Sequence, residues 1–292
     1  AGPPGEAGPV PRPVSKMRAA IFQMTSGIDP AANGAAIADM IGRAAAEGAN
    51  MLFTPEMAGY LDRDRSRAAA TLRCEADDPV LAQVREAAAK HGLWVHLGSL
   101  PLKDERSDGR WANRSFMIDA DGAIRARYDK IHLFDVDLAT GESWRESSVY
   151  GPGEQVVAVD TPWARMGLSV CYDMRFPDLY RALTNAGATV LLMPAAFTVP
   201  TGQAHWHVLL RARAIEAGCF VIAAAQTGRH EDGRETYGHS LIVDPWGEIV
   251  LDMGVEAGLA LAELDLSRVE EVRGRVPAIA NRRILPVDVT LS

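Results

Sequence analysis

The sequence predicts an α/β protein with mixed β-sheets. Short apolar runs of strand length alternate with longer segments whose apolar residues recur at helical spacing. Two pairs of these runs are separated only by turn residues, Asp119 to Gly122 and Asp244 to Gly247, as is typical of antiparallel hairpins. Because strand–helix alternation favours parallel neighbours and hairpins favour antiparallel ones, we expect sheets that contain both.

The first half of the chain contains elements with recognisable starts and stops. Proline is well tolerated in the first turn of a helix, and glycine is common where a helix ends. One helical segment begins at Pro30 and ends at Gly48, and another begins at Pro79 and ends before Gly92. The predicted elements are a strand at 18–23, a helix at 30–48, a strand at 51–55, a helix at 79–91, a strand at 93–100 and a hairpin of 115–118 with 124–128.

A polar segment, residues 135–154, is predicted to be a loop, and strand–helix alternation resumes after it. The elements that follow are strands near Val156 and Met166, a helix at 177–187, a buried strand at 189–193, a helix at 204–218, a strand at 220–225 and a hairpin of 241–243 with 249–251. The two rounds of strands and helices are compatible with two halves of a sandwich, which periodicity alone does not establish.

Length and composition are those of a globular protein. The 292 residues fit one large α/β domain, and an apolar fraction of 48% is far from that of disordered chains. The net charge of −8 comes from intermixed acidic and basic residues, which favours solubility and offers no basic stripe to nucleic acid. No apolar run approaches the ~20 residues that cross a bilayer. We therefore expect a soluble protein without nucleic-acid or membrane partners.

The amino-terminal segment and the cysteines indicate the compartment. Residues 1–16 are rich in Pro and Gly and lack the pattern of a secretory signal, so we expect a disordered leader or a remnant of cloning before a single domain at 17–292. The chain has an odd number of cysteines, Cys74, Cys171 and Cys219, and their spacing is not that of metal ligands. This cysteine usage fits a reducing compartment and predicts a cytoplasmic location.

Cys171 is the strongest candidate for a nucleophile. It ends the apolar run 167–170 and precedes a polar segment that leads into a helix, and such a junction can present a side chain beside free backbone N–H groups. A typical cysteine is a small buried hydrophobe, and this is our interpretation of Cys74 and Cys219. Cys171 differs because polar and charged residues follow it directly.

A nucleophilic thiol needs a base or a cation nearby, because a free cysteine is mostly protonated at neutral pH. Glu56 and Lys130 each follow a predicted strand, and strand ends can meet in one crevice of an α/β sheet. Taken singly, each is more typical of a solvated surface charge. His205 and His207 would point to different faces of a helix, so a metal site there is not expected.

Four segments together resemble the signature of the nitrilase superfamily, the carbon–nitrogen hydrolases. They match in order and approximate spacing, and the resemblance extends over most of residues 17–283. The segments are 54–57 (TPEM), 128–134 (YDKIHLF), 145–147 (RES) and 169–177 (SVCYDMRFP). The resemblance implies a four-layer αββα sandwich, a homodimer or higher homo-oligomer, and no cofactor or metal.

The resemblance also implies a catalytic triad of Glu56, Lys130 and Cys171, with Glu146 as a second glutamate. Glu56 would take the thiol proton before Cys171 attacks an amide carbonyl, and Lys130 with the N–H of Tyr172 would stabilise the oxyanion. Ammonia would leave after receiving its proton from Glu56, and a water molecule activated by Glu56 would then hydrolyse the thioester.

Three further residues are expected to contact the substrate. Tyr172 and Phe197 belong to matching segments, and Arg175 could bind a carboxylate with both arms of its guanidinium or form a structural salt bridge. Glu146 would orient either the substrate or the ammonium group of Lys130.

Segments 225–230 and 237–240 resemble most closely the deaminated-glutathione amidase branch, whose small carboxylate-bearing substrate would be hydrolysed at an amide. The ω-amidase branch, which acts on α-ketoglutaramate, shares the Cys171 segment and stays an alternative. Nitrilases and N-carbamoyl hydrolases would use the same triad. A non-catalytic interaction protein would be free to lose triad residues, and a metal hydrolase would need a ligand cluster that the spacing does not show.

Overall fold

Two six-stranded sheets form the centre of the computed structural model, which describes residues 15–103, 108–137, 141 and 143–283. In the first sheet, β1 to β3 run parallel and the other neighbours run antiparallel. Its strands, in spatial order, are β16 (Gly258–Asp265), β1 (Lys16–Gln23), β2 (Met51–Phe53), β3 (Trp94–Leu102), β4 (Ala112–Ile118) and β5 (Ile124–Asp129).

The second sheet has the same design. β9, β10 and β11 run parallel and antiparallel strands flank them. The order is β15 (Ile249–Asp252), β14 (Leu241–Val243), β11 (Phe220–Ala223), β10 (Val190–Leu192), β9 (Arg165–Leu168) and β8 (Ala158–Asp160). Two small hairpins complete the β-structure: β6 (Asp135–Asp137) with β7 (Ser143–Arg145), and β12 (Thr227–Arg229) with β13 (Glu235–Tyr237).

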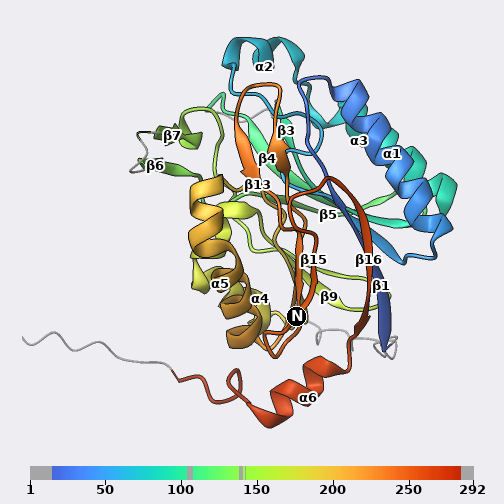
Figure 1. Ribbon diagram of the computed structural model, residues 1–292, viewed down its shortest axis with the longest axis vertical. Coiled ribbons are helices and arrows are strands. Elements are labelled where there is room, and N and C mark those ends of the chain that lie inside the picture. Colours follow the sequence, from blue (N-terminus) through green and yellow to red (C-terminus); the bar gives the residue numbers. More distant parts are fainter. Residues whose placement is uncertain (1–14, 104–107, 138–140, 142, 284–292) are drawn as a thin grey trace, which may run out of the picture.

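Helices cover the outer face of each sheet, so that four layers lie side by side (Figure 1). None of the helices in the described part of the chain is both long and apolar enough to span a membrane. On the first sheet lie α1 (Pro30–Ala46) and α3 (Pro79–His91), and on the second α4 (Pro177–Asn185) and α5 (Val199–Ala217). The remaining helices are α2 (Arg65–Thr71) and α6 (Arg268–Arg275), with short 3-10 turns η1 (Glu75–Asp77), η2 (Glu146–Ser148) and η3 (Cys171–Arg175).

Strand β1 shows why the layers stack in this order. Its residues Ala20 and Phe22 pack with α1 and α3, whereas Met17, Ala19 and Ile21 pack with the second sheet. Successive side chains of a strand point to opposite faces, so an apolar strand of this kind is buried on both sides. The first sheet therefore lies between a helical layer and the other sheet. The predicted four-layer αββα sandwich with mixed sheets is confirmed.

The structure corrects several boundaries. Lys16, assigned from the sequence to the leader, is the first residue of β1 and pairs with Asp265, while residues 1–14 lie outside the described part. Helix α5 begins at Val199 rather than Ala204, and its early Gly202 is required because a Cβ there would lie 2.2 Å from the Tyr237 ring. The polar segment predicted as a loop contains β6, β7 and η2, and β16 and α6 were not predicted.

Candidate active site

Glu56 follows β2, in a loop that is held against β3. A Cβ at position 98 would lie 2.1 Å from the Thr54 carbonyl oxygen, so only glycine allows this close approach. Met57, which follows Glu56, has a φ of 55° and donates its N–H to Ser99 Oγ at 2.9 Å. This backbone turns the Glu56 side chain inward, where it is 4% exposed.

Lys130 lies between two carboxylates. Its Nζ is 2.9 Å from Glu56 Oε1 and 2.8 Å from Glu146 Oε2, and its side chain is 3% exposed. Asn113, on β4, donates its amide to Glu56 at 2.9 Å and to Glu146 at 3.2 Å. The N–H of Phe134 also donates to Glu146, at 2.7 Å. A buried charge needs such partners, and the network fixes the positions of all three ionised groups.

Cys171 begins η3, three residues after the end of β9, in a left-handed conformation with φ of 50°. Non-glycine residues seldom adopt this conformation, which costs about 1–2 kcal/mol. Its N–H donates to the Pro194 carbonyl at 2.8 Å, and this bond holds the turn in place. The sulfur contacts the Glu56 carboxylate and the N–H of Ala196, and that N–H also donates to Glu56 Oε2 at 2.9 Å.

Asp173 connects the Cys171 turn to the segment that carries Lys130. Its carboxylate is fully buried and accepts the N–H of Val170 at 2.8 Å, within the turn. It also accepts the Tyr128 hydroxyl at 2.7 Å and contacts the N–H and ring of His132 at 3.0 and 2.7 Å. Tyr128 and His132 flank Lys130 in the chain, so one carboxylate fixes the nucleophile relative to the ammonium group.

Burial and charge set the protonation states of the site. Burial raises the pKa of the Cys171 thiol well above its usual range, and the Glu56 carboxylate raises it further. Burial by itself raises the pKa of Glu56, but the Lys130 ammonium, with hydrogen bonds from Cys171 and Asn113, outweighs burial and the pKa lies below its usual range. Burial lowers the pKa of Lys130, yet Glu146 and Glu56 raise it well above normal. At neutral pH the site therefore holds a neutral thiol, a carboxylate and an ammonium group.

A titration of the thiol tests this assignment. A raised pKa keeps an acid neutral to higher pH, so the thiolate absorbance of Cys171 should be absent up to about pH 9, beyond the ~8.5 of a free cysteine. The measurement is the ultraviolet difference between wild type and Cys171→Ala across the pH range. Thiolate that develops below pH 8 in the wild type only would contradict the assignment.

A cavity of about 460 Å³ opens onto the sulfur. Most of the residues predicted from the sequence line it: Glu56, Lys130, Glu146, Cys171, Tyr172 and Phe197. Arg175 is not among the lining residues. Its guanidinium lies 5.9 Å from the Tyr172 ring centre and 5.5 Å from that of Phe197, and it contacts His205 Nδ1 at 3.3 Å. No salt bridge of Arg175 is present among the described residues, and its guanidinium packs on two rings that line the cavity.

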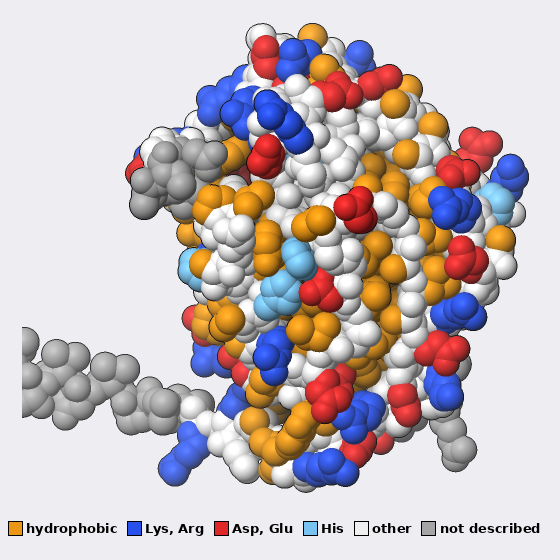
Figure 2. All heavy atoms as spheres, viewed as in Figure 1, with side chains coloured by type: hydrophobic (Ala, Val, Ile, Leu, Met, Phe, Trp, Pro, Cys, Tyr) orange, Lys and Arg blue, Asp and Glu red, His pale blue; other side chains and the backbone are white. Residues whose placement is uncertain are grey.

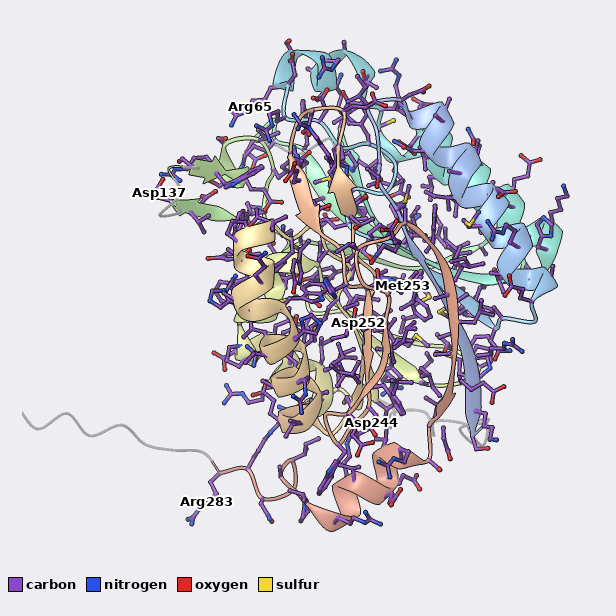
Figure 3. All side chains as sticks on the ribbon, in the orientation of Figure 1. Arg65, Asp137, Asp244, Asp252, Met253 and Arg283 are labelled. Carbon is purple, nitrogen blue, oxygen red and sulfur yellow. The ribbon has the colours of Figure 1, made fainter. Side chains whose placement is uncertain are left out.

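The sequence analysis missed the basic rim of this cavity. Arg63 and Arg234 stack over the Trp144 ring at 5.9 and 5.2 Å and share the carboxylate of Asp232. Arg65 also lines the cavity, and Figure 3 shows it at the start of α2, on the side of the molecule where β6 and β7 lie. Arg234 is far from Arg63 and Arg65 in the sequence, and only the fold brings it to the same cavity. The sequence analysis also gave no role to Asn113, although its amide donates to both glutamates.

Comparisons with known proteins place the chain in a family. The sequence model of the carbon-nitrogen hydrolases matches residues 18–274. The nitrilase and fragile histidine triad fusion protein of Caenorhabditis elegans is 42% identical over 90% of this chain, which spans 60% of that protein. Its crystal structure superposes with a TM-score of 0.86 at 40% identity, covering 93% of this chain and 66% of that one.

Two further relatives are similar along nearly their whole length. The deaminated glutathione amidase of Yersinia enterocolitica is 39% identical, with 91% of this chain and 93% of the relative covered. An amidase from Nesterenkonia superposes with a TM-score of 0.77 at 28% identity, covering 95% of this chain and 97% of that one. That structure is a glutamate-to-glutamine mutant with the acetamide moiety of fluoroacetamide bonded to its active-site cysteine. The chain belongs to the carbon-nitrogen hydrolase family, within the nitrilase superfamily that its four segments predicted.

Proposed function

We propose that this protein is a thiol amidase that hydrolyses an amide of a small carboxylate-bearing molecule, with deaminated glutathione as the best candidate. The observation that carries the proposal is that Cys171 and Glu56 line the same cavity, where the Glu56 carboxylate binds the Lys130 ammonium at 2.9 Å. A nucleophile, a base and a fixed cation thus adjoin one cavity. The curated relatives that are deaminated glutathione amidases, about 39% identical, support the substrate class.

The first half of the reaction transfers the acyl group to sulfur. Glu56 takes the thiol proton as the sulfur bonds to the amide carbonyl carbon, so no free thiolate is needed beforehand. The oxygen of the tetrahedral intermediate is stabilised by the Lys130 ammonium and by the N–H of Tyr172, which has no acceptor inside the turn because it lies at its start. The carbon–nitrogen bond then breaks, and the leaving nitrogen receives the proton from Glu56.

The second half returns the enzyme to its starting state. Glu56 takes a proton from water as the water oxygen bonds to the thioester carbon. The carbon–sulfur bond breaks, the carboxylic acid product leaves, and the sulfur regains its proton from Glu56. Glu146 does not need to exchange protons in this scheme. Its two contacts to Lys130, at 3.1 and 2.8 Å, orient the ammonium group toward the developing oxyanion.

Product analysis tests the substrate directly. Wild-type protein is offered deaminated glutathione and α-ketoglutaramate separately, and the products are identified by mass spectrometry. We expect a higher kcat/KM for deaminated glutathione. Preference for α-ketoglutaramate would keep the mechanism and move the protein to the ω-amidases, and cleavage of nitriles or carbamoyl compounds alone would overturn the amidase proposal.

The carboxylate of the substrate should bind the basic rim. Arg65 is the best candidate, because Asp232 partly neutralises Arg63 and Arg234 whereas Arg65 donates only to the Ser148 hydroxyl among the described residues. Arg65→Gln should raise KM about tenfold with little change in kcat, because the lost contact binds the substrate and the transition state equally well. The matched control is Arg43→Gln on the outer helix α1, which should leave KM unchanged. An unchanged KM in Arg65→Gln would remove Arg65 from the binding site.

We also infer a cytoplasmic homodimer. All three cysteines are unpaired, which fits a reducing compartment. Val208 and Ile215 on α5, with the neighbouring Trp246, expose 68%, 52% and 47% of their surfaces, which favours contact with a second copy. Light scattering after size exclusion should give twice the mass of one chain, and a monomer would contradict the inference.

A further inference from the structure

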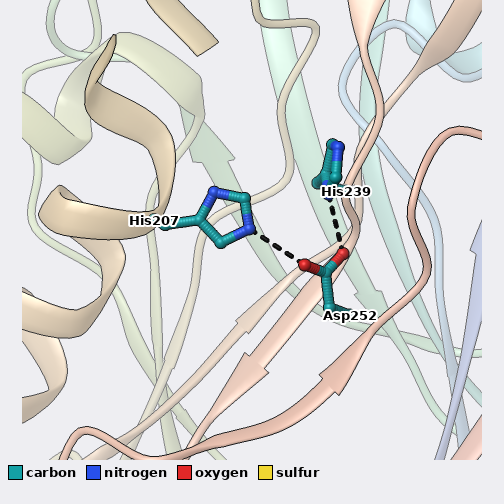
Figure 4. A group of neighbouring side chains, drawn as sticks. All are labelled: His207, His239 and Asp252. Atoms are coloured by element: carbon teal, nitrogen blue, oxygen red, sulfur yellow. Dashed lines mark hydrogen bonds and ion pairs between the residues drawn. The ribbon is translucent and has the colours of Figure 1, made fainter. Parts of the chain in front are cut away.

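Two histidines and an aspartate meet at the surface away from the cavity lining. His207 comes from α5, His239 from the loop before β14, and Asp252 from the end of β15. His207 Nε2 lies 2.9 Å from Asp252 Oδ2, and His239 Nδ1 lies 2.9 Å from Asp252 Oδ1 (Figure 4). Figure 2 shows histidine side chains beside an acidic one on this face. No spacing in the sequence shows this group, because 45 and 13 residues separate the histidines from the aspartate.

The three side chains have the chemistry of a metal site. One ligand atom from each residue lies within 4.8 Å of the others, and two imidazoles with one carboxylate is a donor set that Zn²⁺ accepts. Such ligands lie about 2.0–2.2 Å from zinc, so the group needs only small side-chain rotations to enclose an ion. The side chains are 24–32% exposed, which lets them rotate and leaves room for water as a further ligand.

The protonation of the two rings permits metal binding. In the absence of metal, each ring can donate the N–H that faces Asp252. The opposite nitrogens, His207 Nδ1 and His239 Nε2, have no hydrogen-bond partner among the described residues. Each proton can therefore move to the outer nitrogen, which gives up the hydrogen bond to Asp252 and leaves a lone pair on the inner nitrogen for a metal ion.

The surrounding contacts fix two of the three ligands before any ion binds. The Gly254 N–H donates to Asp252 Oδ1 at 2.9 Å and orients the carboxylate. His239 is held at φ 53° and stacks on the Tyr237 ring, with ring centres 4.5 Å apart. Contacts of this kind around metal ligands increase affinity because they limit ligand motion.

We propose that His207, His239 and Asp252 form a binding site for a divalent transition metal, with Zn²⁺ as the best match. The site lies apart from the residues proposed for catalysis and supplies no step of the reaction. It joins α5 to the β14–β15 hairpin. Trp206 donates its indole N–H to the His239 carbonyl at 2.8 Å and packs on Phe197, which lines the cavity. A bound ion would thus stabilise one wall of the cavity.

Metal binding by the purified protein tests the proposal. Because the Cys171 thiol can itself take Zn²⁺, all titrations use the Cys171→Ala protein after treatment with a chelator. We expect one equivalent of Zn²⁺ by calorimetry, and affinity lower by at least about tenfold in His207→Ala, His239→Ala and Asp252→Asn. His205→Ala, two residues away on the same helix, is the matched control and should bind as the parent does. A parent without one-equivalent binding, or unchanged affinity in His239→Ala, would overturn the site.

A spectroscopic measurement keeps the proposal testable even if a variant fails to fold. With ¹⁵N-labelled histidine in the Cys171→Ala protein, Zn²⁺ should shift the ring signals of two of the seven histidines. His207→Ala should remove one of these two signals, and His239→Ala should remove the other. Shifts spread over all the histidines, or no shift at all, would contradict a site made of these residues.

Discussion

Cys171→Ala is expected to lower kcat by at least about 10⁴-fold, because the carbon–sulfur bond of the intermediate can no longer form. Binding of the product should persist, since the cavity walls and the Glu56–Lys130 contact do not depend on the sulfur. The measurement combines the turnover rate with calorimetric titration of the product acid. In wild type, rapid quenching and mass spectrometry should also find the acyl group on the peptide that contains Cys171.

The control is Cys74→Ser, which changes a thiol that is only partly buried and contacts Asp77 rather than the cavity. It should keep wild-type turnover. Full activity in Cys171→Ala, with the circular dichroism of the folded protein, would rule out Cys171 as the nucleophile.

Glu56→Gln should reduce kcat by about 10³-fold, because a neutral amide cannot accept the thiol proton or activate water. The replacement has the same shape, and its one oxygen can still accept from Lys130 and Asn113, so we expect the overall structure to be kept. Product affinity, measured as above, should change far less than kcat.

Glu154→Gln is the matched control, since Glu154 is exposed and does not line the cavity. Glu56→Gln with more than a tenth of wild-type kcat would show that another group takes the proton.

The sequence predicted those parts of the structure that depend on local pattern. Pro79 and Gly92 mark the start and end of α3 as predicted, because the ends of a helix are governed by neighbouring residues. The position of Cys171 at a strand-to-turn junction was visible for the same reason. That Glu56 and Lys130 meet Cys171 was implied by family resemblance, since strand spacing does not reveal how two sheets face each other.

Other features depend on tertiary packing and could not be predicted. The side chain of Arg175 lies over the Tyr172 and Phe197 rings, although its segment suggested a carboxylate partner in the cavity. Asp173 bonds to residues of two segments, its own turn and residues 128–132, and its sequence neighbours indicate only the first. Helix α5 starts before Pro200, which the first helical turn accepts, and continues through Gly202, whose low helix propensity is overridden by close packing against the Tyr237 ring of β13.

The division of the site between the two sheets has a consequence for folding. Glu56, Asn113 and Lys130 come from the first sheet, whereas Cys171 and Ala196 come from the second. Neither half of the chain holds a nucleophile together with its base, so an intermediate with only one sheet assembled would be inert. After dilution from denaturant, the recovery of activity therefore reports when the two sheets dock. Activity should recover more slowly than the helical circular dichroism signal.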